Sequence, residues 1–176
     1  MGKKILVSAG HSTVPPKDSG ASGNGFVEAQ EALKLRDAVA KILLEKKAEV
    51  TIDGVDGESQ PLRKAIELAK KAEVAVEIHF NAGGSTATGI EVLAKANHTA
   101  LAQKLAGAIA EATKLKLRGD KGYKADNSGQ HHRLGFCEAG GLIIDVCFIS
   151  NLDDMTAYSA NFPQIALNLA NVLASA

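Results

Sequence analysis

The sequence predicts one α/β domain, with a mainly parallel twisted sheet that contains an antiparallel strand and carries helices on both faces. Short runs of apolar, often β-branched residues, such as 74–80 and 142–148, indicate buried strands. Between these runs, apolar residues recur every three or four positions, which is typical of amphipathic helices. Strands that alternate with such helices favour a parallel sheet covered on both sides. Because 176 residues suit one sizeable core, we expect residues 1–176 to form a single domain.

The first half of the chain contains four predicted elements. They are a strand at 5–7, a helix from about Phe26, a strand at 50–52 and a helix from about Pro61. The loop at 12–24 is rich in proline, glycine and small residues, so we expect it to be irregular and exposed. In the helix near Pro61, the apolar spacing predicts that Leu62 and Ala65 face inward.

The second half contains six more predicted elements. They are strands at 74–80, 89–94 and 142–148, a helix from about Thr99, a short helix near Asp153 and a final helix over 162–173. Only a short loop separates the strand at 89–94 from the previous strand, whereas a parallel crossover needs about a dozen residues or more. That strand is therefore predicted to be antiparallel if the two pair directly. Residues 115–135 are rich in lysine and glycine and are expected to be mostly loop.

The composition excludes several classes of function. Twenty basic residues balance twenty acidic ones, so bulk charge does not favour nucleic acid or an anionic membrane. No apolar run reaches the roughly 20 residues that span a bilayer, so we expect no membrane insertion. The two cysteines, Cys137 and Cys147, are too few for a disulfide scaffold and form no CxxC zinc pattern.

Two imidazoles and one carboxylate stand at the ends of predicted elements. His11 follows the first strand, Glu28 lies in the first turn of a helix, and His79 comes near the end of the strand at 74–80, where ligands bind in open α/β sheets. Two histidines and one acid suit catalytic zinc, which keeps one position open for water. Each residue also has a structural interpretation: His11 as a hydrogen-bonding loop residue, Glu28 as a partner of the helix dipole, and His79 as a core histidine. The residues alone leave both interpretations open.

Three groups of motifs occur in a fixed order along nearly the whole chain. The first comprises GH at 10–11, DSGASG at 18–23 and NGFVE at 24–28, the second is IHFNA at 78–82, and the third is DVCFISN at 145–151. Together they resemble the zinc-dependent N-acetylmuramoyl-L-alanine amidases of the Amidase_3 family. The resemblance implies that His11, Glu28 and His79 bind Zn²⁺. It also implies a peptidoglycan hydrolase that cleaves the amide between N-acetylmuramic acid and the L-alanine of the stem peptide.

The last motif departs from the family at one position. Where the family usually has glutamate, this chain has Asp145, which is one methylene shorter. We expect Asp145 to keep the catalytic role, taking a proton from the attacking water and passing it to the leaving amine. Glu138, expected in a loop, is the second candidate for this role. We also expect Asn81 and His132 to contact the substrate.

Two other classes of function stay open. The shorter Asp145 is consistent with a non-catalytic module that binds zinc or peptidoglycan. A cysteine hydrolase would use Cys137 or Cys147 with His131 or His132, although Cys147 lies within an apolar strand, which is typical of a core residue.

The setting is predicted from the start of the chain and from the resemblance. The apolar run after Met1 is too short for a signal peptide, so we expect synthesis in the cytoplasm and action on the bacterial cell wall. We expect no separate cell-wall-binding domain, an organisation that resembles compact phage endolysins, and a bacterial autolysin without its leader would look the same. We expect a monomer.

Overall fold

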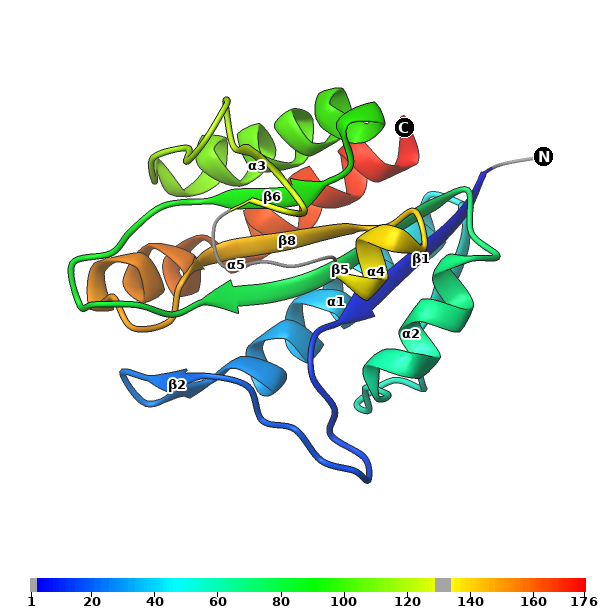
Figure 1. Cartoon of the computed structure of the whole chain (residues 1–176), viewed down its shortest axis with the longest axis horizontal. Coiled ribbons are helices and arrows are strands. Elements are labelled where there is room, and N and C mark those ends of the chain that lie inside the picture. The colour runs from blue at the N-terminus through cyan, green and yellow to red at the C-terminus, as the bar shows by residue number, and fades with distance from the viewer. Residues whose placement is uncertain (1–2, 129–133) are drawn as a thin grey trace.

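The computed structural model describes residues 3–128 and 134–176, and within these it contains a six-stranded sheet and a two-stranded hairpin (Figure 1). The strands of the large sheet lie in the order β4-β1-β5-β8-β6-β7. Their bounds are Lys4–Ala9 for β1, Glu49–Ile52 for β4, Val74–Asn81 for β5, Glu91–Ala94 for β6, Tyr123–Ala125 for β7 and Leu142–Phe148 for β8. Neighbours pair in parallel except β6 and β8, which are antiparallel. The predicted mainly parallel sheet is confirmed.

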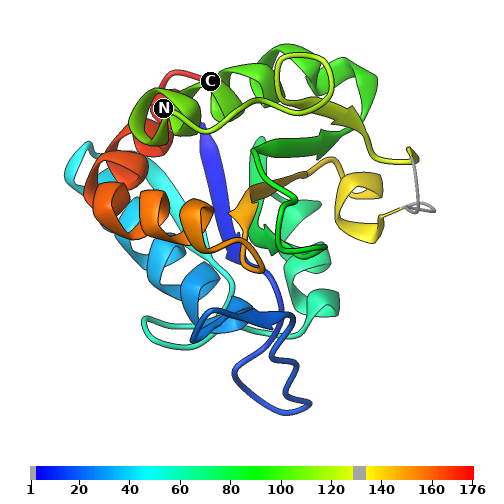
Figure 2. The ribbon, with the colours of Figure 1, turned by 90° about the vertical axis from the view of Figure 1, so that its left-hand side faces the viewer.

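Helices cover both faces of the sheet, as predicted (Figures 1 and 2). One face carries α1 (Glu28–Glu45), α3 (Thr99–Thr113) and α5 (Leu152–Ala174), and the other carries α2 (Leu62–Ala69) and α4 (Gly135–Glu138). A 3₁₀ turn, η1 (Ala96–His98), precedes α3. Within the part of the chain that the structure describes, none of the helices combines the length and apolar character needed to cross a membrane.

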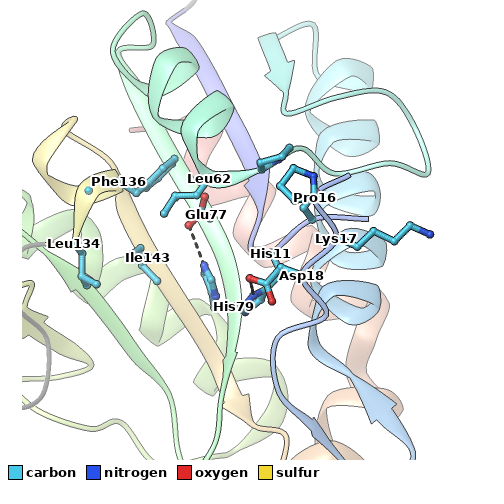
Figure 3. A pocket seen from close by; sticks show the side chains of 13 residues that line it. His11, Pro16, Lys17, Asp18, Leu62, Glu77, His79, Leu134, Phe136 and Ile143 are labelled. Carbon is cyan, nitrogen blue, oxygen red and sulfur yellow. Dashed lines mark hydrogen bonds and ion pairs between the residues drawn. The ribbon is translucent and has the colours of Figure 1, made fainter. Parts of the chain in front are cut away.

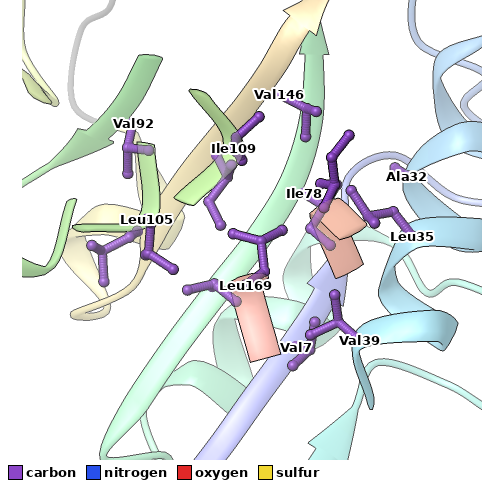
Figure 4. Close-up of a cluster of buried hydrophobic side chains, with 14 of the residues drawn as sticks. Val7, Ala32, Leu35, Val39, Ile78, Val92, Leu105, Ile109, Val146 and Leu169 are labelled. Atoms are coloured by element: carbon purple, nitrogen blue, oxygen red, sulfur yellow. The ribbon is translucent and has the colours of Figure 1, made fainter. Parts of the chain in front are cut away.

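The larger core lies between the sheet and α1, α3 and α5 (Figure 4). In β5, Val76 and Ile78 point into this core, and Ala75 packs in the smaller cluster on the opposite face. Side chains alternate between the two faces of a strand, so Glu77 and His79 share the face of Ala75. Among the described helices, the short α2 and α4 pack on that face, and a cavity lies there beside the polar end of β5.

Three local features differ from the sequence-based expectations. The end of the expected loop at 12–24 and the residues expected to begin the helix form a small hairpin, in which β2 (Ser22–Gly23) pairs with β3 (Phe26–Val27). The helix α1 therefore begins at Glu28 instead of near Phe26. The strand at 89–94 is antiparallel, as expected, but its antiparallel neighbour is β8 rather than β5. Part of the expected loop at 115–135 forms β7, which extends the sheet beyond β6.

Two further expectations about helices were wrong. The two helices predicted at the C-terminal end form the single 23-residue helix α5, with Pro163 inside it. Proline removes one helical hydrogen bond, but core residues on both sides of Pro163, among them Met155 and Leu169, bury the same helix face. Leu62 does not face inward: as the first residue of α2 it is 52% exposed and lies beside the cavity.

Candidate metal centre

The three predicted ligands converge at one edge of the sheet. His11 follows β1 and His79 belongs to the adjacent parallel strand β5, so both lie at the carboxyl ends of neighbouring strands. Glu28 is the first residue of α1, and its carboxylate lies between the two imidazoles. Oε2 of Glu28 is 3.0 Å from Nε2 of His11, and Oε1 is 3.0 Å from Nδ1 of His79. Potential ligand atoms of all three residues lie within 4.8 Å of one another, close enough to hold one metal ion.

Backbone groups and glycines fix these side chains. The N–H groups of Ala21 and Phe80 donate to the Glu28 carboxylate at 2.9 and 3.0 Å. Gly10 lies against the ring of His79, where a β-carbon would overlap the imidazole. His11 itself has a positive φ of 67°, which non-glycine residues rarely adopt outside sites that need it. The arrangement is therefore built tightly around the two rings.

In each histidine, the ring nitrogen that does not face Glu28 contacts a second carboxylate. Nδ1 of His11 is 2.8 Å from Oδ2 of Asp18, and Nε2 of His79 is 2.9 Å from Oε1 of Glu77 (Figure 3). Neither contact was predicted from the sequence. Glu77 could have been found, because it lies two positions before His79 on a strand and therefore on the same face.

The carboxylates set the charge of the cluster in the metal-free protein. Burial opposes a charged imidazole, yet hydrogen bonds to Glu28 and Glu77 raise the pKa of His79 to about 10. Burial likewise opposes the charge on His11, but Glu28 and Asp18 raise its pKa. In the same way, burial opposes ionisation of Glu28, and the two histidines still lower the pKa of its carboxyl group. The site thus pairs an ionised carboxylate with cationic rings, and a metal ion could replace that positive charge.

Asp145 lies on the strand next to His79. The two residues are register partners in β8 and β5, and Asp145 is 8% exposed. Burial raises the pKa of Asp145 to about 7, with help from the negative charges of Glu91 and Glu28 and against the opposing charge of His79. A carboxyl group with this pKa exchanges protons readily near neutral pH.

A buried ion-pair network lies on the other side of Asp145. Glu91 of β6 is the register partner of Asp145 and is 2% exposed. Its carboxylate pairs with Arg118 and with Nζ of Lys124, the latter at 3.0 Å. Asn81, predicted to contact substrate, donates from Nδ2 to Glu91 at 3.0 Å and accepts from the N–H of Ala82 at 2.9 Å. Sequence reasoning missed this network because it depends on the pairing of β6 with β8.

The remaining candidates lie elsewhere. Glu138 is in α4 rather than in a loop, and its carboxylate is 3.1 Å from Nζ of Lys95. His132 and His131 lie outside the described residues. Cys137 and Cys147 are both fully buried, and burial raises the pKa of Cys137 to about 12 and that of Cys147 well above its usual value.

A cavity of about 410 Å³ opens beside the two histidines (Figure 3). Its walls are largely apolar, with Glu77 and His79 on one side and Lys17 among the lining residues. The apolar lining residues are Pro16, Pro61, Leu62, Leu134, Phe136 and Ile143. The cavity can therefore receive a ligand next to the candidate metal ligands.

Comparisons with known proteins agree with the resemblance found in the sequence. Residues 5–175 match the Amidase_3 family model, described as N-acetylmuramoyl-L-alanine amidase. A crystal structure of a candidate N-acetylmuramoyl-L-alanine amidase from Neisseria meningitidis is 38% identical, with a TM-score of 0.88 over 98% of this chain and 94% of that one. The catalytic domain of CwlV, an N-acetylmuramoyl-L-alanine amidase from Bacillus (Paenibacillus) polymyxa var. colistinus, is 25% identical, with a TM-score of 0.82 over 98% and 97%.

A curated relative matches over a similar length. The uncharacterised protein YqiI of Bacillus subtilis is 26% identical over 160 residues, which cover 87% of this chain and 73% of YqiI. The family match spans nearly the whole chain and includes both histidine motifs and the last strand. The chain therefore belongs to the Amidase_3 family of N-acetylmuramoyl-L-alanine amidases.

Proposed function

We propose that this peptidoglycan amidase is zinc-dependent and cleaves the amide between N-acetylmuramic acid and the L-alanine of the stem peptide. The observation that carries the proposal is the convergence of His11, Glu28 and His79 around one point, in a chain that matches the amidase family from residue 5 to residue 175. The products would be a lactyl carboxylate on the sugar and a free amino group on L-alanine.

The donor set fits Zn²⁺. Two imidazole nitrogens and one carboxylate make three protein ligands, the number typical of catalytic zinc. Glu28 is ionised over the neutral pH range because its pKa is lowered, and a metal would displace from each histidine the one proton that faces Glu28. Zinc held by these residues would supply Lewis acidity toward the scissile carbonyl and the attacking water.

Asp145 is the residue that we assign to proton transfer in the reaction. Its position beside His79 and its pKa of about 7 suit a group that accepts a proton from water and returns it to the leaving nitrogen of L-alanine. Positioned acid–base groups contribute roughly 10²–10⁴-fold to rate. Glu138 is a poorer candidate, because its carboxylate pairs with Lys95 and is 47% exposed.

Substrate binding is assigned to the cavity beside the histidines. Its apolar walls would contact the parts of the substrate next to the scissile amide and exclude water from them. Roles for Asn81 and His132 in substrate binding stay predictions from the sequence, as do the monomeric state and an endolysin-like lytic setting.

Product analysis of a digest of purified peptidoglycan tests the proposal. The unaltered protein should release new N-terminal L-alanine and no new reducing ends, and His79→Ala should release neither. Reducing ends without new amino termini would indicate a glycosidase. Tight binding to peptidoglycan with no release of either product, in the presence of zinc, would favour the non-catalytic module.

A further inference from the structure

Glu77 is a buried carboxylate that the proposed mechanism does not use. Its side chain is 4% exposed, yet it lies at the cavity beside His79. Oε1 of Glu77 is 2.9 Å from Nε2 of His79, and Oε2 accepts a hydrogen bond of 3.4 Å from the hydroxyl of Ser8. A buried carboxylate is costly unless its oxygens are paired, and both oxygens of Glu77 are paired here.

Strand geometry places Glu77 in this position. Ser8 and Glu77 are register partners in the adjacent parallel strands β1 and β5, and Ser8 is fully buried. Glu77 and His79 are two residues apart on β5, so their side chains leave the same face. Rigid sheet positions therefore hold all three groups, and no loop is involved.

The contacts of His79 also decide which ring nitrogen faces Glu28. Nδ1 faces Glu28 and Nε2 faces Glu77, each within hydrogen-bond distance. A 180° flip about the Cβ–Cγ bond would put ring carbons where both nitrogens now lie, and Glu28 and Glu77 would each lose their hydrogen bond to His79. Gly10 lies against the ring and restricts its plane, but such a contact does not distinguish the two flips.

We propose that Glu77 is a positioning residue for the metal centre, which holds the Nε2–H of His79 so that Nδ1 is the nitrogen offered to the metal. Histidine ligands commonly donate their other N–H to a carboxylate, which fixes the ring and its tautomer. Asp18 makes the equivalent contact to Nδ1 of His11, so His11 would bind through Nε2. The two histidines therefore bind through different nitrogens.

This inference rests on the proposed metal site, and ¹⁵N NMR of the zinc-loaded protein separates the two ideas. We expect His79 to be metal-bound at Nδ1 and protonated at Nε2, and His11 to show the opposite pattern. Zinc bound to Nε2 of His79 would overturn the role of Glu77 and leave the metal site intact. If neither His11 nor His79 responds to one equivalent of zinc, the metal site itself is overturned.

Variants of Glu77 give a second test. Zinc affinity, measured by competition with a chromophoric chelator, should fall by about 10–100-fold in Glu77→Leu. Glu77→Gln should lose less, because its amide oxygen can still accept the Nε2–H. Glu31→Gln is the matched control: Glu31 is 5% exposed, but its carboxylate pairs with Lys34, so zinc affinity should not change.

The pattern among these variants decides the outcome. Unchanged zinc affinity in both Glu77→Leu and Glu77→Gln would overturn the proposal. The metal-free variants should melt cooperatively, which shows that they fold. If Glu77→Leu does not fold, the NMR pattern of the unaltered protein, with the outcomes given above, decides whether Glu77 sets the nitrogen of His79 that binds zinc.

Discussion

Gly10→Ala is a steric test of the His79 position, because the change adds one methyl group at a single place. The new β-carbon would lie within 2.5 Å of three ring atoms of His79. Carbon atoms in contact are separated by about 3.5 Å or more, so the ring must move by about 1 Å. Gly10 does not have a positive φ, and its backbone can accept alanine without strain.

The expected loss follows from this displacement. A misplacement of about 1 Å in catalytic machinery can cost about 100-fold in rate, which corresponds to about 2.7 kcal/mol. Zinc affinity should also fall, because the ring moves away from the carboxylates of Glu28 and Glu77. In the unaltered protein each carboxylate lies about 3 Å from a ring nitrogen. We therefore expect kcat/KM for release of amino groups from peptidoglycan to fall by about two orders of magnitude.

The matched control is Gly107→Ala in the helix α3. A β-carbon at Gly107 would meet no atom within 4 Å, and alanine is favoured over glycine in helices by about 0.5–1 kcal/mol. Gly107→Ala should keep full activity and zinc content and melt at the same or a slightly higher temperature. If Gly10→Ala folds and matches the unaltered protein in both zinc affinity and kcat/KM, the inferred place of His79 in the site is refuted.

Asp145, the two cysteines and the metal ligands can each be tested separately. Asp145→Asn should keep zinc but lower kcat by about 100-fold or more, whereas Asp145→Glu should retain turnover; unchanged kcat in the asparagine variant would remove Asp145 from the mechanism. Cys137 and Cys147 are fully buried with raised pKa values, so a thiol reagent at pH 8 should label neither in the folded protein and both after unfolding; rapid labelling of the folded protein would favour the cysteine hydrolase. Zinc at about 100 times its Kd should stabilise the fold by about 2.7 kcal/mol and raise Tm by roughly 5–10 °C, and the same rise in His79→Ala would show that zinc binds elsewhere.

The sequence predicts most of the fold because local pattern and tertiary burial agree. The alternation in β5 and the apolar run of β8 are both strands in the structure, and the helical stripe before β4 is α1. The errors lie where long-range pairing decides. Tyr123–Ala125 has little apolar character of its own and becomes β7 by pairing with β6. Pro163 favours a break between two helices, but a continuous buried face keeps α5 intact.

Some residues of the candidate site could likewise be placed from the sequence, and others could not. His11 and His79 could be brought together from sequence, since carboxyl ends of neighbouring parallel strands meet at one edge of the sheet. The position of Asp145 next to His79 required the order of the strands. Glu91 could not be placed from the sequence at all, because β6 does not pair with the preceding strand β5 but lies on the far side of β8. Glu77 could be placed beside His79 from their spacing on β5, but its contact with Ser8 needs the register of β1 and β5.

Zinc titration of the metal-free protein, followed by measurement of the amino groups released from purified peptidoglycan, shows whether hydrolysis depends on zinc. Activity should be absent without metal, rise linearly with added zinc and level off at about one zinc per chain, with L-alanine as the new amino terminus. Full release of L-alanine by the metal-free protein would show that the enzyme does not need zinc.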